Sequence, residues 1–193
     1  MTTWHWVRHG PTHEKTFVGW RDVPADLTDA AQIARLNAHL PQEALLISSD
    51  LIRASATADV LSAPGRKRLP HAPNLREFNF GLWDGMGFDA VAKRDPDLSR
   101  AYWENPGDPT PPEGESWNAA TARVKTVVDQ LNADHPDAHI IAVAHIGVIV
   151  TQIQRALAAT PKEAIGHKID NLSVTQLTHD NGQWDVKGIN HLP

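Results

Sequence analysis

The 193-residue sequence contains no cysteine. This absence excludes disulfides, thiolate zinc sites and a cysteine nucleophile. The sequence also lacks an apolar run long enough to span a membrane, and Met1 leads into an expected strand without the regions of a signal peptide. We therefore expect a cytoplasmic protein with no membrane partner.

Positive charge is scarce as well. Lys and Arg number 18 against 23 Asp and Glu, which gives a formal net charge of −5. Because nucleic-acid binding needs a basic face that neutralises backbone phosphates, we expect no nucleic-acid partner. Any site for an anion must be a local concentration of cationic side chains.

The chain has no linker rich in Pro, Gly or Ser, no internal repeat and no low-complexity tract. Its length and 41% hydrophobic content suit one well-buried domain over residues 1–193. The sequence leaves open whether this domain is a monomer or a homodimer. Seven Trp stand against one Tyr, and we interpret Trp4, Trp6 and Trp184 as core anchors.

Strand and helix signals alternate along the chain, which is typical of an α/β fold with a mostly parallel sheet covered on both faces. The expected strands are 4–7, 45–49, a weaker 68–70, 140–144, and two edge-like strands, 173–178 and 184–189, around the Asn181-Gly182 turn. The first expected helix opens at 27–29, and the second follows a Ser49 or Asp50 cap and ends at 64–65. The third runs from near Ser116 to before Pro136, and the fourth runs from 145 to about 158. Residues 105–112, rich in proline, should form a surface loop.

Arg8 and His9 stand where the first expected strand gives way to the Gly10-Pro11 loop. Open α/β sheets bind ligands at the carboxyl ends of their strands. A guanidinium beside an imidazole repels a metal ion but suits an oxyanion. The pair therefore indicates an anion site, although a strand end with incidental charge fits these residues equally well.

Two further side chains follow other strands of the expected parallel sheet. Arg53 lies in the first turn of the helix after the second strand, and His145 directly follows the 140–144 strand. Because the carboxyl ends of parallel strands meet at one edge, both can converge with Arg8 and His9. Taken alone, Arg53 could be a solvated helix residue and His145 a satisfied core histidine.

Five ordered blocks of the sequence resemble the histidine phosphatase superfamily, also called phosphoglycerate mutase-like. They are VRHGPT at 7–12, GWRD at 19–22 with LT at 27–28, SSDLIRA at 48–54, REFNFGLWDG at 76–85 and VAHIGVI at 143–149. The resemblance implies a three-layer α/β/α sandwich with a mostly parallel central sheet. It also implies a covalent phosphohistidine mechanism that needs no metal and no cofactor.

By this resemblance, His9 is the nucleophile, Glu77 is the general acid, and Arg8, Arg53 and His145 bind the phosphoryl oxygens. A neutral imidazole can attack phosphorus if a backbone carbonyl holds its second nitrogen. His145 would help most as an imidazolium, and a carboxyl facing phosphate should have a raised pKa. Sequence alone also permits Glu77 to be a surface carboxylate paired with Arg76.

The chain departs from the common family pattern at three positions. Lys15 stands where many members have asparagine, so it could contact phosphate as a point charge or be solvated. Ile146 stands in place of a second glycine, where a backbone N–H contact to phosphate survives but a tight turn need not. Pro11 replaces a frequent glutamate. Asp84 is a weaker acid candidate that better fits a turn before Gly85.

The short chain and its FGLWDG segment resemble the phosphatase branch of the superfamily, which includes α-ribazole phosphatase-like members. We therefore favour hydrolysis of a small phosphorylated substrate. Residues 78–117, with Trp83, Phe88 and Trp103, are the expected lid and substrate wall, although these rings could equally form local core. Mutase-type phosphoryl transfer, a non-catalytic phosphate-binding regulatory module and, least favoured, a metal hydrolase remain as alternatives.

Overall fold

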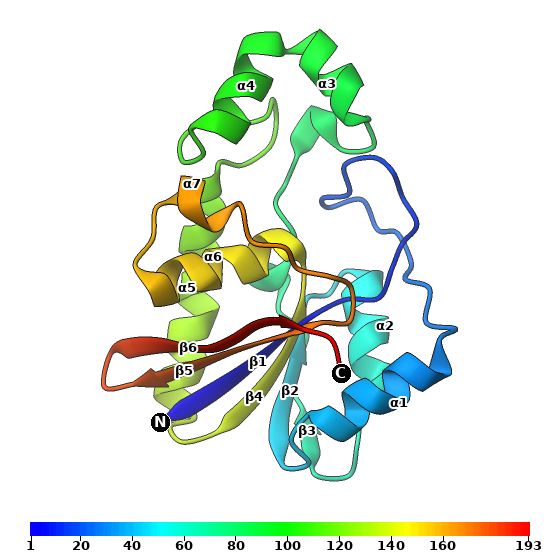
Figure 1. Ribbon diagram of the computed structural model, residues 1–193, viewed down its shortest axis with the longest axis vertical. Coiled ribbons are helices and arrows are strands. Elements are labelled where there is room, and N and C mark those ends of the chain that lie inside the picture. Colours follow the sequence, from blue (N-terminus) through cyan, green and yellow to red (C-terminus); the bar gives the residue numbers. More distant parts are fainter.

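The computed structural model describes residues 1–193, and its centre is one six-stranded sheet (Figure 1). The strands are β1 (Thr2–Arg8), β2 (Ala44–Ser48), β3 (Arg66–Arg68), β4 (His139–Ala144), β5 (Val174–Asp180) and β6 (Gln183–His191). They lie in the order β3-β2-β4-β1-β5-β6. The first four are parallel to one another, whereas β5 pairs antiparallel with both β1 and β6. The mostly parallel sheet predicted from the sequence is confirmed.

Seven α-helices accompany the sheet. They are α1 (Ala30–His39), α2 (Ile52–Val60), α3 (Phe88–Arg94), α4 (Pro96–Glu104), α5 (Trp117–Asp134), α6 (Ile146–Leu157) and α7 (Pro161–Ala164). Helices α1 and α2 cover one face and α5 and α6 cover the other, while α3 and α4 lie apart beyond α7 (Figure 1). This arrangement confirms the three-layer α/β class.

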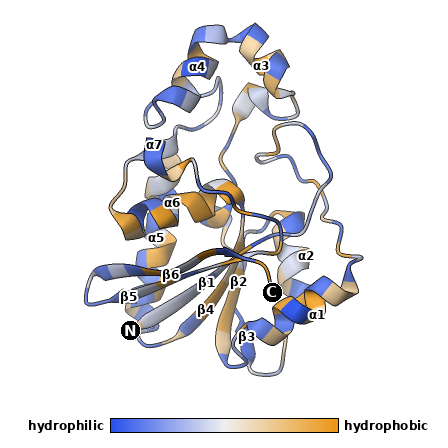
Figure 2. Ribbon diagram, in the orientation of Figure 1, coloured by the Kyte–Doolittle hydropathy of each residue, from blue (hydrophilic) through white to orange (hydrophobic).

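Successive side chains of the central strands enter two different cores, because they point to opposite faces of the sheet. Trp4 and Trp6 stack with ring centroids 5.0 Å apart and are fully buried against α5 and α6. Val7 enters the second core, against α1 and α2. Figure 2 shows the apolar residues concentrated on the central strands and on α6. Trp184 is only half-buried at the margin of the first core, so it is a weaker anchor than expected.

The weak strand predicted at 68–70 lies two residues earlier, as β3 (Arg66–Arg68). Parallel pairing begins with Ala44 opposite Arg66, directly after the Pro64-Gly65 turn. The buried Arg66 guanidinium supports this register, because it donates to the carbonyl of Pro41 at 2.9 Å and to carbonyls at the ends of α1 and α2.

The last two strands form the predicted hairpin, but only one of them is an edge. The Asn181-Gly182 turn has positive φ at both residues, as a two-residue hairpin loop requires. Strand β5 lies between β1 and β6, so its expected edge position is wrong. Residues on both faces of β5 are buried, Val174 and Leu177 among them, so apolar and polar residues do not alternate regularly along this strand.

The start of α2 also differs from the prediction. The sequence suggests a Ser49 or Asp50 cap, but α2 begins at Ile52 with no side-chain cap from the preceding residue. The Asp50 carboxylate instead binds Arg76 through hydrogen bonds of 2.8 and 2.6 Å. The amide of Ile52 donates to Asp22 Oδ1 at 2.7 Å, so a distant loop supplies the missing acceptor.

The segment 78–117 contains α3 and α4, two helices that its sequence pattern does not predict. Its predicted 105–112 loop is present and continues to residue 116. Four side chains make a small separate core beneath the two helices: Phe17, Trp83, Val91 and Tyr102. Phe17 comes from the loop after β1, so this core ties that loop to the segment.

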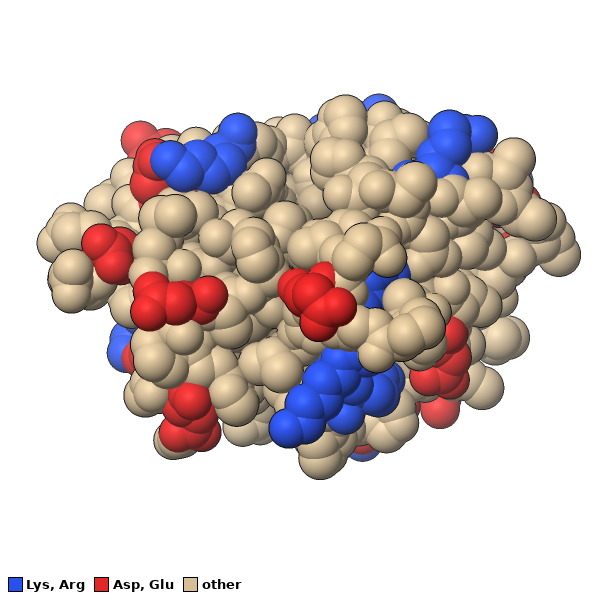
Figure 3. Space-filling model, turned by 90° about the horizontal axis from the view of Figure 1, so that it is seen from below, with Lys and Arg blue, Asp and Glu red and all other residues tan.

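None of the helices has both the length and the apolar character that crossing a membrane requires. Figure 3 shows the end of the molecule opposite α3 and α4, where acidic and basic side chains are interspersed. Neither sign of charge forms a continuous field over this face.

Candidate active site

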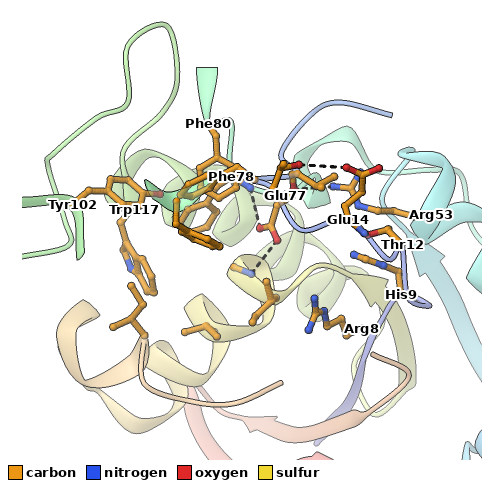
Figure 4. A pocket seen from close by; sticks show the side chains of 18 of the residues that line it. Arg8, His9, Thr12, Glu14, Arg53, Glu77, Phe78, Phe80, Tyr102 and Trp117 are labelled. Carbon is orange, nitrogen blue, oxygen red and sulfur yellow. Dashed lines mark hydrogen bonds between the residues drawn. The ribbon is translucent and has the colours of Figure 1, made fainter. Parts of the chain in front are cut away.

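A cavity of about 370 Å³ opens where β1 and β4 end, between the sheet and the α3–α4 segment. Four of the five residues singled out from the sequence for catalysis or phosphate binding line it: Arg8, His9, Arg53 and Glu77. Figure 4 shows Arg8, His9 and Arg53 on one side of the cavity, aromatic rings on the other and Glu77 between them. The parallel sheet brings the first three together because β1 and β2 end at the same edge.

His9 directly follows β1 and is held through its backbone and its ring. Its N–H donates to the carbonyl of Ala144 at 3.1 Å, and Asn171 Nδ2 donates to its carbonyl at 2.8 Å. The ring Nδ1 lies 2.7 Å from the carbonyl oxygen of Gly10, which can only accept, so Nδ1 carries the proton. The lone pair is therefore on Nε2. Burial and the Arg53 charge lower the pKa of His9 to about 3, which keeps the ring neutral.

The two arginines are anchored by carbonyls and form no ion pair with a carboxylate. Arg8 Nη1 donates to the carbonyl of Ile169 at 2.6 Å. Arg53 is 1% exposed and donates to the carbonyls of Gly19 at 2.6 Å and Arg21 at 3.0 Å. The interpretation of Arg53 as a solvated helix residue is therefore wrong. Both guanidiniums keep their full positive charge beside His9, since no anionic side chain neutralises it by direct contact.

His145 is fully buried, with its ring centroid 5.1 Å from that of His9. Neither ring nitrogen has a hydrogen-bond partner, so it is not the satisfied core histidine that the sequence also permitted. Burial, Arg53 and His9 lower the pKa of His145 well below its ordinary value. His145 therefore becomes the expected imidazolium only if an anion beside the ring raises its pKa again.

Glu77 is 4% exposed and sits between the charged and aromatic sides of the cavity (Figure 4). Its Oε1 accepts from the amide of Phe78 at 2.9 Å and its Oε2 from the amide of Gly147 at 3.3 Å. It does not pair with Arg76, so the surface-carboxylate alternative is wrong. Burial raises the pKa of Glu77 despite these donors and the two nearby arginines.

A side chain at position 147, one residue after the family departure at Ile146, would force Glu77 to move. A Cβ on Gly147 would lie 2.4 Å from Glu77 Oε1. Ile146 is 38% exposed and lines the cavity, so its side chain has room that Gly147 lacks. The close approach of backbone and carboxylate is thus preserved despite the departure.

Two weaker candidates for the site, Lys15 and Asp84, do not line the cavity. Lys15 is exposed. The carboxylate of Asp84 accepts from the amides of Gly19 and Arg21 at 3.1 and 2.9 Å. It therefore orders the loop whose carbonyls bind Arg53, which is a larger role than the turn position expected for it.

Several residues that shape the site are not singled out by the sequence. Asn171 and Ile169 hold His9 and Arg8 from the loop before β5, and Leu172 N donates to the carbonyl of Arg8 at 2.9 Å. The carbonyl of Glu77 accepts from Arg123 Nη2 at 2.8 Å and Trp20 Nε1 at 2.7 Å. Trp20 lies in a family-like block, which is a signal for it, whereas Asn171 lies in none. Thr12, Glu14 and Thr16 also line the cavity.

The expected lid supplies much of the aromatic wall. Trp83 is fully buried local core, but Phe88 and Trp103 line the cavity together with Phe17. The Phe17 ring centroid lies 4.5 Å from that of Phe88 and 6.0 Å from that of Trp103. Trp83 is therefore local core, whereas the contact of Phe88 and Trp103 with a substrate stays a prediction.

Comparison with known proteins places this geometry in a family. A bifunctional protein of Mycobacterium tuberculosis is 33% identical over 142 residues, which are 74% of this chain but only 37% of that protein. The adenosylcobalamin/alpha-ribazole phosphatase of Escherichia coli is 25% identical, with 95% of this chain and 88% of that protein covered. A solved mycobacterial glucosyl-3-phosphoglycerate phosphatase, in complex with VO3, superposes with a TM-score of 0.85 at 26% identity, over 97% of this chain and 98% of that chain.

The family model of the histidine phosphatase superfamily, branch 1, matches residues 5–192. This range includes every residue singled out above for the cavity. The chain belongs to the histidine phosphatase superfamily.

Proposed function

We propose that this protein hydrolyses small-molecule phosphomonoesters through a covalent phosphohistidine on His9. The observation that carries the proposal is the His9 ring itself. Its Nδ1 proton is committed to the Gly10 carbonyl, its Nε2 lone pair is free, and two arginines without carboxylate partners lie beside it. A neutral nucleophile beside fixed cationic donors is the arrangement that phosphoryl transfer needs.

In the first step, His9 Nε2 attacks phosphorus while the bond between phosphorus and the ester oxygen breaks. Arg8, Arg53 and His145 receive the charge that develops on the equatorial oxygens. Glu77, whose pKa burial raises, donates its proton to the departing oxygen. The products are the free alcohol and phosphohistidine.

In the second step, the Glu77 carboxylate accepts a proton from water as the water oxygen attacks phosphorus. The bond between phosphorus and Nε2 breaks, inorganic phosphate leaves, and both side chains return to their starting protonation. The hydrogen bond from Nδ1 to Gly10 keeps the ring oriented through both steps. The alpha-ribazole and glucosyl-3-phosphoglycerate phosphatases support hydrolysis as the overall reaction.

The proposal is tested with a generic aryl phosphate and no added metal. We expect turnover that a chelator does not reduce, inhibition by vanadate, and an acid-labile phosphoenzyme. His9→Ala should abolish the phosphoenzyme, whereas His191→Ala, at the exposed end of β6, should not. Full activity of His9→Ala would refute the proposal, and loss of activity on chelation would favour a metal hydrolase.

Two other reactions are distinguished in the same preparation. Conversion of a monophosphoglycerate in the presence of a bisphosphoglycerate primer, faster than its hydrolysis, would identify mutase-type transfer. Binding of phosphate without turnover of any ester would identify a regulatory module. Glu77→Gln separates the acid from the binders, because it should slow esters with poor leaving groups far more than activated aryl esters.

A further inference from the structure

The cavity has two halves of opposite chemistry. Its charged half holds Arg8, His9 and Arg53, all of which the proposed phosphate position uses. Its other half is formed by aromatic and aliphatic side chains, and Figure 4 shows Phe78, Phe80, Tyr102 and Trp117 grouped there, away from the arginines. A phosphoester with its phosphate at His9 must therefore place its organic part against this apolar half.

No cationic side chain lines the apolar half. The cations of the surrounding segments, such as Lys15, Arg21 and Lys162, lie outside the cavity lining. Arg21 is also paired, with its Nη2 3.1 Å from Glu14 Oε2. A carboxylate or second phosphate on the substrate would thus lose its hydration without gaining a positive partner, which is a large cost.

The other polar groups of the lining do not favour a second anion either. Glu14 lies beside Thr12 and Arg53 (Figure 4) and adds a negative charge to the cavity lining, although Arg21 pairs with it. The indole N–H of Trp117 is already committed to Gln154 Oε1 at 2.6 Å. Val150 and Ile165 offer no hydrogen-bond donor, and the donors of Tyr102 and Trp103 are neutral groups that do not balance a full negative charge.

Exposed aromatic rings at the mouth complete the apolar half. Phe88 on α3 is 58% exposed and Trp103 on α4 is 36% exposed, although both line the cavity beside Phe17. Exposed rings gathered at a cavity mark a surface that another apolar group covers. The cavity, about 370 Å³, is at the small end of the range for small-molecule sites, so it suits one or two rings rather than a long chain.

We propose that the preferred substrate is the phosphomonoester of an uncharged, flat, apolar alcohol or phenol, and that phosphoesters with a second anionic group are poor substrates. This inference rests on the proposed function, since it assumes that phosphate lies at His9. It assigns the selection of the leaving group to Phe88 and Trp103, with Glu14 as the residue that disfavours anions.

The test compares kcat/KM for 1-naphthyl phosphate with that for 3-phosphoglycerate and phosphoserine. We expect kcat/KM for the naphthyl ester to be at least ~100-fold higher. A desolvated carboxylate without a cationic partner costs several times the free energy that corresponds to a tenfold change in kcat/KM. Trp103→Ala and Phe88→Ala should each raise KM for the naphthyl ester about tenfold and leave inhibition by inorganic phosphate unchanged. Leu157→Ala, an exposed apolar residue of α6 outside the cavity, is the matched control and should change neither.

Glu14→Gln supplies a test of the charge. It removes one negative charge from the cavity lining and leaves Arg21 with Asp84 as its acidic partner, so it should raise kcat/KM for 3-phosphoglycerate relative to the naphthyl ester. Equal kcat/KM for the two ester classes, or equal effects of Trp103→Ala on both, would overturn the inference while the proposed function stands.

Binding separates the two proposals if turnover is absent. 1-Naphthyl phosphate and 3-phosphoglycerate are titrated into His9→Ala and followed by calorimetry. Tighter binding of the naphthyl ester would support the apolar half even without hydrolysis. Tighter binding of 3-phosphoglycerate would refute it.

Discussion

Replacing Gly147 with alanine should impair the proposed acid without touching the nucleophile. The added Cβ would lie 2.4 Å from Glu77 Oε1 and 3.0 Å from a ring carbon of Phe78. Ordinary contacts begin near 3.4 Å, so the carboxylate must retreat by about 1 Å. This retreat lengthens the bond from the Gly147 amide to Glu77 Oε2, which is already 3.3 Å.

The expected loss follows from the role assigned to Glu77. A displacement of 1 Å costs about 10²-fold in rate, which lies within the 10² to 10⁴-fold that general acids contribute. We expect kcat for an alkyl phosphate to fall about 100-fold, but kcat for 4-nitrophenyl phosphate to fall much less, because its leaving group needs no proton. Overpacking should also lower the free energy of unfolding by about 1 to 3 kcal/mol.

Steady-state kinetics on the two esters, with urea unfolding at the assay temperature, measure both effects. Gly188→Ala is the matched control, because a Cβ there meets nothing within 4 Å and β6 is remote from the cavity. Equal losses on the two esters would refute the assignment of Glu77 as the acid. An unchanged rate on the alkyl ester would show that the carboxylate is not confined as the contacts indicate.

Two further predictions concern stability. Burial lowers the pKa of His5 to about 4, so between pH 6.5 and 4 a proton binds His5 in the unfolded chain but not in the folded protein. The stability that neutral His5 contributes is therefore complete above pH 6.5 and falls below it. Urea unfolding should show a loss of about 2 kcal/mol in the free energy of unfolding between pH 7.5 and 5, and this loss should be smaller in His5→Leu. A pH dependence identical in His5→Leu would refute this reasoning. Asp22→Ala removes the acceptor for the Ile52 amide and should lower the free energy of unfolding by about 1 kcal/mol. Asp59 is exposed on α2, and Asp59→Ala should change the free energy of unfolding by less than about 0.5 kcal/mol. Equal effects of the two substitutions would show that Asp22 does not act as the cap of α2.

The sequence predicts the parts of the site that follow from parallel strands. Arg8, His9, Arg53 and His145 each come at or just after the carboxyl end of β1, β2 or β4, and such ends share one edge whatever the details of packing. The hydrogen bond from His9 to a backbone carbonyl was also expected, because a nucleophilic imidazole needs it.

The sequence does not predict contacts that depend on packing between remote segments. Asn171 reaches His9 because β5 turns antiparallel to β1, and the alternation of β5 alone does not reveal its neighbours. Asp22 caps α2 across 30 residues, where local capping rules point to Asp50 instead. The short helices α3 and α4 rest on a small core of their own, so their apolar residues give too few turns for a clear helical period.

The loop before β5 holds the last residue of β1 and the residue that follows it. Arg8 Nη1 donates to the carbonyl of Ile169, Asn171 Nδ2 to the carbonyl of His9, and the amide of Leu172 to the carbonyl of Arg8. A ribosome makes this loop more than 150 residues after β1. The nucleophile therefore waits for its supports while those residues are synthesised, and a nascent chain completes the centre only once residue 172 has left the ribosome.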